Sequence, residues 1–153
     1  MGFRRKHGLE TRIVRVFNCH GPNMRLDDGR VVPNYVGRSL RGEPLTVYGD
    51  GSQTRSLCYV DDLVSGLLAV LHGPDPLPFN VGTDDEVSML DLARLVKRLT
   101  GSSSEIEFGP LPEDDPKQRR PDLTRARQIL GWAPAVAMED GLRRTVEYFR
   151  ASI

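Results

Sequence analysis

Short segments with two different hydrophobic periods alternate along the chain. Alternating or β-branched segments predict strands, and apolar residues spaced three and four apart predict amphipathic helices. The predicted strands are 12–17, 45–48, 56–60, 79–82 and 105–108. The predicted helices are 31–41, 61–72, 89–100, a short one after residue 122, and 138–149. The alternation of strands and helices predicts a mixed α/β fold.

Capping residues mark the ends of these helices. Pro33 suits the first turn of the first predicted helix, and Gly42 follows its last residue. Either Asp61 or Asp62 is expected to cap the second helix. Ser88 begins a capping box that predicts the start of the third helix.

The apolar stripes of the second and third helices are expected to belong to the core. They consist of Leu63, Leu67, Val70 and Leu71 in one helix and Leu92, Leu95, Val96 and Leu99 in the other. Trp132 and Phe149 are expected to serve packing as well. Hydrophobic residues make up 39% of the 153 residues, and aromatic residues 7%. That composition is lean for a domain of this size, so the core is expected to be modest.

Charge and cysteine content exclude several classes of protein. Lysine plus arginine number 21 and aspartate plus glutamate also number 21, so the formal net charge is zero. This balance disfavours a nucleic-acid or membrane-surface binder, which would show a basic excess. The longest apolar run, at 67–71, is too short to cross a bilayer. Cys19 and Cys58 form no CxxC motif, which favours a reducing, cytoplasmic location.

Several catalytic and cofactor motifs are missing from the sequence. It contains no GxGxxG or GxxGxxG turn, no GxxxxGK[ST] loop and no GxSxG elbow. No tyrosine is followed by a lysine four residues later, so the Tyr-x-x-x-Lys pair of short-chain dehydrogenases is absent. The three histidines, at 7, 20 and 72, lie far apart and near no acidic or cysteine cluster, so no metal site is expected.

Four segments together carry a resemblance to a known family. They are 15–22 (RVFNCHGP), 28–35 (DGRVVPNY), 42–55 (GEPLTVYGDGSQTR) and 114–122 (DDPKQRRPD). Their order and spacing resemble the C-terminal half of the extended short-chain dehydrogenases/reductases that act on nucleotide sugars. Within that family the resemblance is greatest to the UDP-glucuronate decarboxylases, over about residues 3–150. The third and fourth segments together are specific for the resemblance to the decarboxylases. The first segment is less specific, because dTDP-glucose 4,6-dehydratases and epimerases contain similar motifs.

The resemblance implies a Rossmann domain followed by a smaller substrate domain, with the N-terminal Rossmann half absent from this chain. Residues 1–153 would form the substrate-binding portion as a single unit, and 12–22 and 79–82 would belong to the Rossmann sheet. A truncated reading frame and a separately encoded Rossmann half both remain open. Unpaired strand edges would make the isolated chain marginally stable or prone to association. Family members are usually homodimers.

The resemblance also implies an activity, the NAD-dependent conversion of UDP-glucuronate to UDP-xylose and carbon dioxide. Because the Tyr/Lys pair and the glycine-rich turn are missing, we expect no catalytic residue here and no turnover by this chain alone. NAD is expected to belong to the full-length protein. Two alternatives remain open. One is a portion of a dTDP-glucose 4,6-dehydratase or a nucleotide-sugar epimerase, and the other is a non-catalytic nucleotide-sugar-binding module.

Ten positions match the family's ligand-binding motifs. The predicted substrate-binding residues are Asn18, Val32, Asn34, Tyr35, Tyr48, Gln53, Arg55 and Arg119. The resemblance places Cys19 and Arg30 near the cofactor, with Cys19 as a small filler rather than a nucleophile, since no basic partner is evident.

The chemistry of these residue types suits a UDP-sugar. Amides donate to phosphate or ribose oxygens, free N–H groups at a helix start bind carbonyl or phosphate oxygens, and arginines bind phosphate as planar forks. Each position also has a structural alternative. Asn18 could form a turn, Tyr35 could be core, Arg55 could be a solvated hairpin residue, and Arg119 with Arg120 could be a solvated pair.

Overall fold

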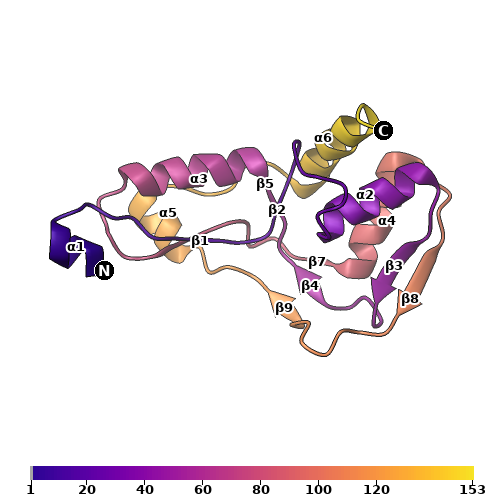
Figure 1. Cartoon of the computed structure of the whole chain (residues 1–153), viewed down its shortest axis with the longest axis horizontal. Coiled ribbons are helices and arrows are strands. Elements are labelled where there is room, and N and C mark those ends of the chain that lie inside the picture. The colour runs from indigo at the N-terminus through magenta and orange to yellow at the C-terminus, as the bar shows by residue number, and fades with distance from the viewer. Residues whose placement is uncertain (1) are drawn as a thin grey trace.

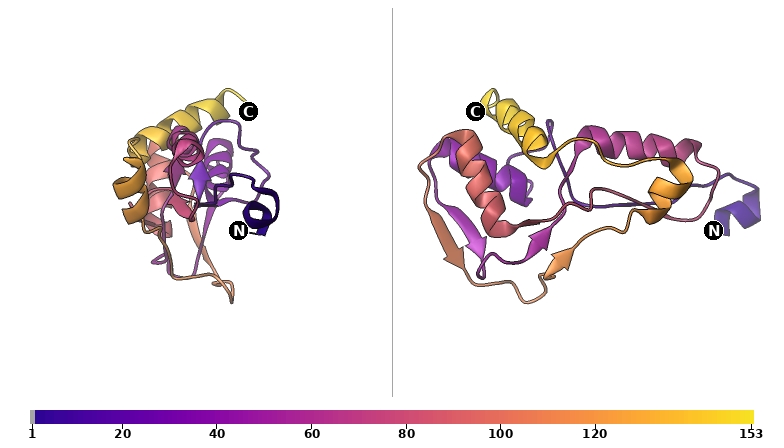
Figure 2. Two further views of the ribbon diagram at one scale, coloured as in Figure 1. Left: turned by 90° about the vertical axis from the view of Figure 1, so that its left-hand side faces the viewer. Right: turned by 180° about the vertical axis from the view of Figure 1, so that it is seen from behind.

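The computed structural model describes residues 2–153 as an elongated α/β molecule with two lobes (Figures 1 and 2). Met1, the first residue of the predicted unit 1–153, lies outside the described residues. What we call the sheet lobe contains β1 (Val14–Val16), α3 (Val60–His72), β6 (Phe79–Val81) and α5 (Thr124–Leu130), with α1 (Gly2–His7) at its end. What we call the pocket lobe contains α2 (Val31–Arg41), β3 (Leu45–Tyr48), α4 (Met89–Thr100), β8 (Ile106–Gly109) and α6 (Met138–Arg150).

Short strands join the two lobes. They are β2 (Cys19–His20), β4 (Thr54–Arg55), β5 (Cys58–Tyr59), β7 (Val87–Ser88) and β9 (Gln118–Arg119). The pairs β1–β6, β2–β5 and β3–β8 are all parallel. Strand β4 pairs antiparallel with β7 and parallel with β9. The mixed α/β fold is therefore confirmed, and β1 and β6, from the two segments assigned by resemblance to one sheet, lie side by side.

The helix and strand predictions hold best in the pocket lobe. Helices 31–41 and 89–100 and strand 45–48 have the predicted bounds. Ser88 caps α4, because its hydroxyl oxygen accepts a hydrogen bond from the Asp91 amide at 3.0 Å. Gly42 and Gly101 end α2 and α4 in the left-handed conformation that glycine adopts without strain. Local sequence signals therefore decided this part of the fold.

One capping prediction is wrong, and one segment without a predicted element contains a strand. Helix α3 starts at Val60 after Tyr59, and no side chain caps it. Asp62 is buried inside the first turn, where its carboxylate accepts a hydrogen bond from the Val136 amide at 2.9 Å. The segment at 109–120, for which no helix or strand is predicted, contains β9. Contacts with residues distant in the sequence account for both differences. The Asp62 carboxylate binds the Val136 amide and not the start of its own helix, and β9 forms by pairing with β4.

Each lobe has its own hydrophobic cluster. The larger cluster joins α2, β3, α4 and α6, and the smaller one joins β6, α3, α5 and Trp132. Trp132 and Phe149 are both buried, but they lie in different clusters. The prediction that the whole α3 stripe is core is wrong, because Leu67 and Leu71 are exposed. Nothing in residues 2–153 covers that face of the helix.

Candidate functional site

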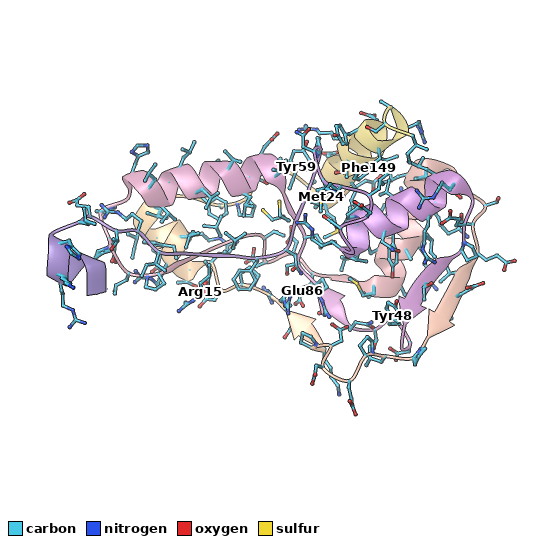
Figure 3. All side chains as sticks on the ribbon, in the orientation of Figure 1. Arg15, Met24, Tyr48, Tyr59, Glu86 and Phe149 are labelled. Carbon is cyan, nitrogen blue, oxygen red and sulfur yellow. The ribbon has the colours of Figure 1, made fainter. Side chains whose placement is uncertain are left out.

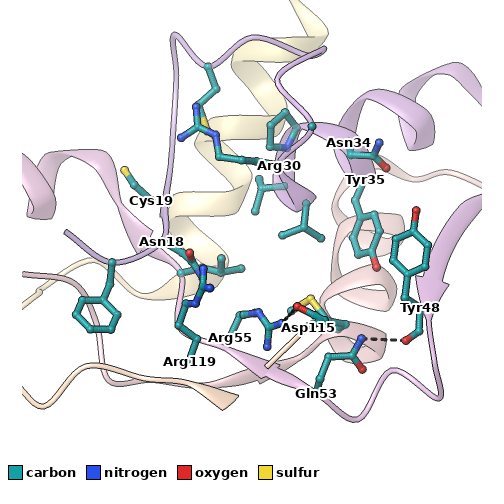
Figure 4. A pocket seen from close by; sticks show the side chains of 18 of the residues that line it. Asn18, Cys19, Arg30, Asn34, Tyr35, Tyr48, Gln53, Arg55, Asp115 and Arg119 are labelled. Carbon is teal, nitrogen blue, oxygen red and sulfur yellow. Dashed lines mark hydrogen bonds and ion pairs between the residues drawn. The ribbon is translucent and has the colours of Figure 1, made fainter. Parts of the chain in front are cut away.

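A cavity of about 620 Å³ opens where the two lobes meet (Figure 4). Its wall is built from the loop after β1, the first turns of α2, and strands β3, β4 and β9. All ten residues predicted to contact substrate or cofactor line this one cavity. Residues that bind one ligand must lie around one cavity, as these ten do. The contact of each residue with a ligand remains a prediction.

The sheet end of the cavity is formed by the segment that follows β1. The Phe17 amide donates to the Val81 carbonyl at 3.0 Å, and the Cys58 amide donates to the Asn18 carbonyl at 2.9 Å. These bonds fix the Asn18 backbone and leave its side chain at the cavity wall. Parallel strands place ligands at their carboxyl ends, so Asn18 occupies a position suited to a ligand.

Cys19 lies next to Asn18 and is half-buried. Burial raises the pKa of its thiol, and the positive charge of Arg30 opposes that effect only in part. A thiol with a raised pKa stays protonated near neutral pH and is a poor nucleophile. These properties agree with the prediction that Cys19 is a small filler.

The N-terminus of α2 faces the cavity without a side-chain cap. Along α2, the first backbone amide that donates a hydrogen bond to a carbonyl is that of Asn34, which donates to the Arg30 carbonyl at 3.1 Å. The amides of Val31 and Val32 donate no hydrogen bond within residues 2–153, and Pro33 has none to donate. Two backbone donors are therefore available to a ligand at this helix end.

Two cavity arginines are held by carboxylates. The Arg30 Nε donates to the Asp28 carboxylate at 2.7 Å. Arg55 is only 8% exposed and forms an ion pair with Asp115, and its guanidinium also donates to the Pro116 carbonyl at 2.8 Å. The alternative of a solvated Arg55 is therefore wrong. Arg55 anchors the 115–116 segment against β4 while lining the cavity (Figure 4).

Arg119, the last residue of β9, and Arg120, which follows the strand, have different surroundings. Arg119 lines the cavity and has no ion pair within the described chain. Arg120 instead approaches Asp84 at 4.0 Å and Glu86 at 3.7 Å. Arg120, for which a solvated pair with Arg119 was the structural alternative, is therefore paired with these two carboxylates. Arg119 is left as an unpaired cation at the cavity wall.

Glu86 holds β9, and so Arg119, in place. It accepts hydrogen bonds from the Thr54 hydroxyl at 2.6 Å and from the Gln118 side-chain amide at 2.9 Å. Thr54 belongs to β4 and Gln118 to β9, so Glu86 joins the two strands (Figure 3). Hydrogen bonding, first from Thr54 and then from Gln118, lowers the pKa of Glu86 and keeps it ionised near neutral pH.

The other end of the cavity carries Tyr35, Tyr48 and Gln53 (Figure 4). Tyr35 is buried, and that burial raises its pKa to about 12, so its hydroxyl stays neutral. The Gln53 side-chain amide donates to the Tyr48 carbonyl at 2.9 Å and braces the glycine-containing turn between them. This end therefore offers neutral hydrogen-bonding groups beside aromatic rings.

Sequence reasoning missed three polar cavity residues, Arg38, Thr46 and Asp115. Arg38 lies three and four residues after Tyr35 and Asn34, so the helical period could have placed it on the same face. Thr46 precedes Tyr48 by two residues, which is the strand period. Asp115 lies in the family-like segment 114–122, but no periodicity places it at the cavity, because its long-range ion pair with Arg55 brings it there.

The cavity concentrates positive charge in a chain of zero net charge. Its wall includes four arginines, at 30, 38, 55 and 119, and one carboxylate, Asp115. Such local excess raises the local concentration of an anionic ligand. The described residues contain no group of histidine, cysteine, aspartate and glutamate side chains that could hold a metal ion. Within residues 2–153, no helix has the length and apolarity needed to span a bilayer.

Comparison with known proteins identifies relatives along the whole chain. UDP-glucuronic acid decarboxylase 4 of Arabidopsis thaliana is 49% identical over 153 residues, which is 100% of this chain and 34% of the relative. The chain thus spans about a third of that curated relative.

Solved structures share the fold closely. UDP-glucose 4-epimerase of Thermotoga maritima, solved with UDP-glucose, matches with a TM-score of 0.94 and 36% identity, covering 99% of this chain and 49% of that one. UDP-glucuronic acid 4-epimerase of Bacillus cereus, solved with UDP-glucuronic acid and NAD, matches with a TM-score of 0.89 and 28% identity, covering 99% and 49%. The model of the NAD-dependent epimerase/dehydratase family matches residues 2–82. The chain therefore belongs to the NAD-dependent epimerase/dehydratase family.

Proposed function

We propose that this chain is the UDP-sugar-binding portion of an enzyme of the UDP-glucuronate decarboxylase type. The unpaired Arg119 in a cavity with excess positive charge is the observation that carries the proposal. UDP-glucuronate bears two phosphates and a carboxylate, and guanidinium groups bind such oxyanions strongly. The 49% identity to a decarboxylase over the full chain supports this substrate over other nucleotide sugars.

The size and layout of the cavity support the same ligand. A volume of about 620 Å³ lies within the range typical of small-molecule sites. Asn18, the free amides of Val31 and Val32, and Arg119 provide donors toward the sheet end. We assign the sugar and diphosphate to these donors. Tyr35, Tyr48 and Gln53 are assigned to the nucleoside.

The residues present do not fit NAD by themselves. A dinucleotide needs a glycine-rich turn between a strand and a helix to hold its diphosphate, and residues 1–153 contain no such motif. Only Cys19 and Arg30 remain as candidate contacts at the edge of a nicotinamide. We therefore assign no chemical step to this chain alone, and its proposed role is to bind and orient the UDP-sugar.

Calorimetric titration with UDP-glucuronate tests the proposal. The purified chain is expected to bind UDP-glucuronate, and Arg119→Ala is expected to weaken binding about tenfold, since a hydrogen bond to a charged group is lost. Arg94→Ala is the matched control, because Arg94 is an exposed arginine of α4 outside the cavity. Equal affinity of Arg119→Ala and the wild type would refute the site assignment.

A parallel titration with dTDP-glucose and UDP-glucose separates the alternatives. Tighter binding of dTDP-glucose would favour a dehydratase, and equal binding of UDP-glucose would remove the case for a carboxylated sugar. The decarboxylase assignment requires that UDP-glucuronate binds most tightly of the three, because only its carboxylate adds an anion for the cavity arginines.

A further inference from the structure

The cavity has two ends with different electrostatic character. Each end contains an arginine that has no carboxylate partner within the described chain. Arg119 lies toward Asn18 at the sheet end. Arg38 lies eight residues beyond Arg30 on α2, which is about 12 Å along the helix axis. Within residues 2–153, Arg38 makes no ion pair. Two separated cations suit a ligand that is polar at both ends.

The contacts of Arg38 leave part of its guanidinium free. Its Nη1 donates to the Pro44 carbonyl at 3.1 Å and to the Thr46 hydroxyl at 3.2 Å. These two bonds hold the side chain between α2 and β3. The Nε and Nη2 groups keep three N–H donors without a partner in the described chain. A half-buried guanidinium with free donors at a cavity wall is placed to bind a ligand acceptor.

The neighbours of Arg38 favour a neutral, planar acceptor over another phosphate. Tyr35, Thr46 and Tyr48 line the same end, and the raised pKa of Tyr35 keeps its hydroxyl neutral. Aromatic rings provide flat contact area for a heterocycle. Two other donors suited to oxyanions, Asn18 and Arg119, lie toward the opposite end (Figure 4). A phosphate bound there places the base of a nucleotide near Arg38.

We propose that Arg38 is a specificity-determining residue that binds the C4 carbonyl oxygen of a uracil base. This deepens the proposed function and rests on it. The C4 oxygen is the base atom farthest from the ribose, so it reaches deepest toward Arg38. Cytosine carries an amino group at that position, and arginine has donors but no acceptor. The site therefore accepts a uracil nucleotide and rejects a cytosine nucleotide, whose amino donor would face unpaired donors.

Titration with UDP and CDP tests this proposal, because the two ligands differ only in the base. The wild-type chain is expected to bind UDP at least about tenfold more tightly than CDP, as expected for a hydrogen bond to a charged group. Arg38→Met keeps the side-chain length and removes every donor. It is expected to bring the UDP and CDP affinities within about threefold of each other, mainly by weakening UDP.

Two further variants secure the result. Arg41→Met is the matched control, because Arg41 lies on the same helix but pairs with Glu43 outside the cavity. It is expected to keep the full preference for UDP. If circular dichroism shows that Arg38→Met does not fold, Arg38→Gln replaces it. Glutamine has both a donor and an acceptor, so it is expected to admit both bases.

The outcomes separate this inference from the function on which it rests. Equal wild-type affinity for UDP and CDP, or an unchanged preference in the folded Arg38 variant, would overturn the role of Arg38 while leaving UDP-sugar binding intact. Binding of neither nucleotide to the wild type would overturn the proposed function, and the role of Arg38 with it.

Discussion

The two lobes of this molecule differ in how completely they bury their apolar surface. The pocket lobe encloses thirteen buried residues from α2, β3, α4 and α6 with Leu57, whereas the sheet-lobe cluster contains six. The sheet lobe also leaves large apolar side chains exposed on α3 and β1. They are Val16, Val64, Leu67, Leu68 and Leu71.

The difference follows from how far each lobe covers its own two-stranded parallel sheet. Parallel strands joined by helices are normally covered on both faces, and β1 and β6 form a parallel pair of only two strands. The helices of the pocket lobe cover one another, so its sequence suffices for its own core. The cavity lies where the self-sufficient lobe meets the incompletely covered one. The sheet side supplies residues 16–19, and the pocket lobe and the joining strands supply most of the remaining wall.

Catalysis is the most complete test of this contrast. With UDP-glucuronate and NAD, this chain alone is expected to form no UDP-xylose, because neither lobe carries the Tyr/Lys pair or a dinucleotide-binding turn. Chromatographic detection of UDP-xylose after prolonged incubation measures this. Any turnover above a no-protein control would show that the sheet lobe is functionally complete.

A matched pair of leucine substitutions measures the difference in packing. Leu142→Ala, in the pocket-lobe cluster, is expected to lower the free energy of unfolding by about 2–5 kcal/mol, because it leaves a cavity. Leu71→Ala, at a residue that is 59% exposed on α3, is expected to cost no more than about 0.5 kcal/mol. Urea unfolding gives both values. A cost for Leu71→Ala that approaches that of Leu142→Ala would mean that α3 is covered in solution.

Acid is expected to weaken the junction between the lobes through His20. The Nδ1 of this buried histidine lies 3.2 Å from the Thr145 hydroxyl of α6, and that hydroxyl donates to the Gly141 carbonyl at 2.7 Å. Because that hydroxyl donates to Gly141, it accepts a hydrogen bond from Nδ1, and Nε2 has no hydrogen-bond partner in the described chain. Burial lowers the His20 pKa to about 4 from 6.5.

The unfolded chain binds a proton at His20 below pH 6.5, whereas the folded chain does so only near pH 4. Stability from this residue is thus present at neutral pH and falls between pH 6.5 and pH 4, by roughly 3 kcal/mol in total. Urea unfolding at several pH values measures it. His20→Phe is expected to flatten this part of the profile, and an equally steep profile in the variant would assign the effect to other groups.

The smallest expected effect concerns the Glu86 contacts that hold β9. Glu86→Ala is expected to weaken UDP-glucuronate binding about threefold, because the side-chain link between Thr54 of β4 and Gln118 of β9 is lost while the backbone pairing of the strands remains. In that background Arg119→Ala is expected to cost less than in the wild type, with a coupling of about 1 kcal/mol. Calorimetry of the four proteins gives this value. Glu107→Ala, at an exposed glutamate of β8, is the control, and strict additivity would show that Glu86 does not position Arg119.

The sequence alone determined most of the pocket lobe. The bounds of α2, β3 and α4 follow from local signals such as Gly42, Ser88 and Gly101. The family resemblance also selected ten residues that the structure brings to one cavity. Local signals suffice here because hydrophobic period, caps and turn residues act within a few positions of each other.

Only the tertiary structure decided which of those side chains are available to a ligand. The sequence does not show that Arg55 is held by Asp115 or that Arg120 approaches Glu86. The apolar stripe of α3 also did not show that Leu67 and Leu71 are exposed to solvent. The two ion pairs join residues that are 60 and 34 positions apart, and local periodicity carries no information about such contacts.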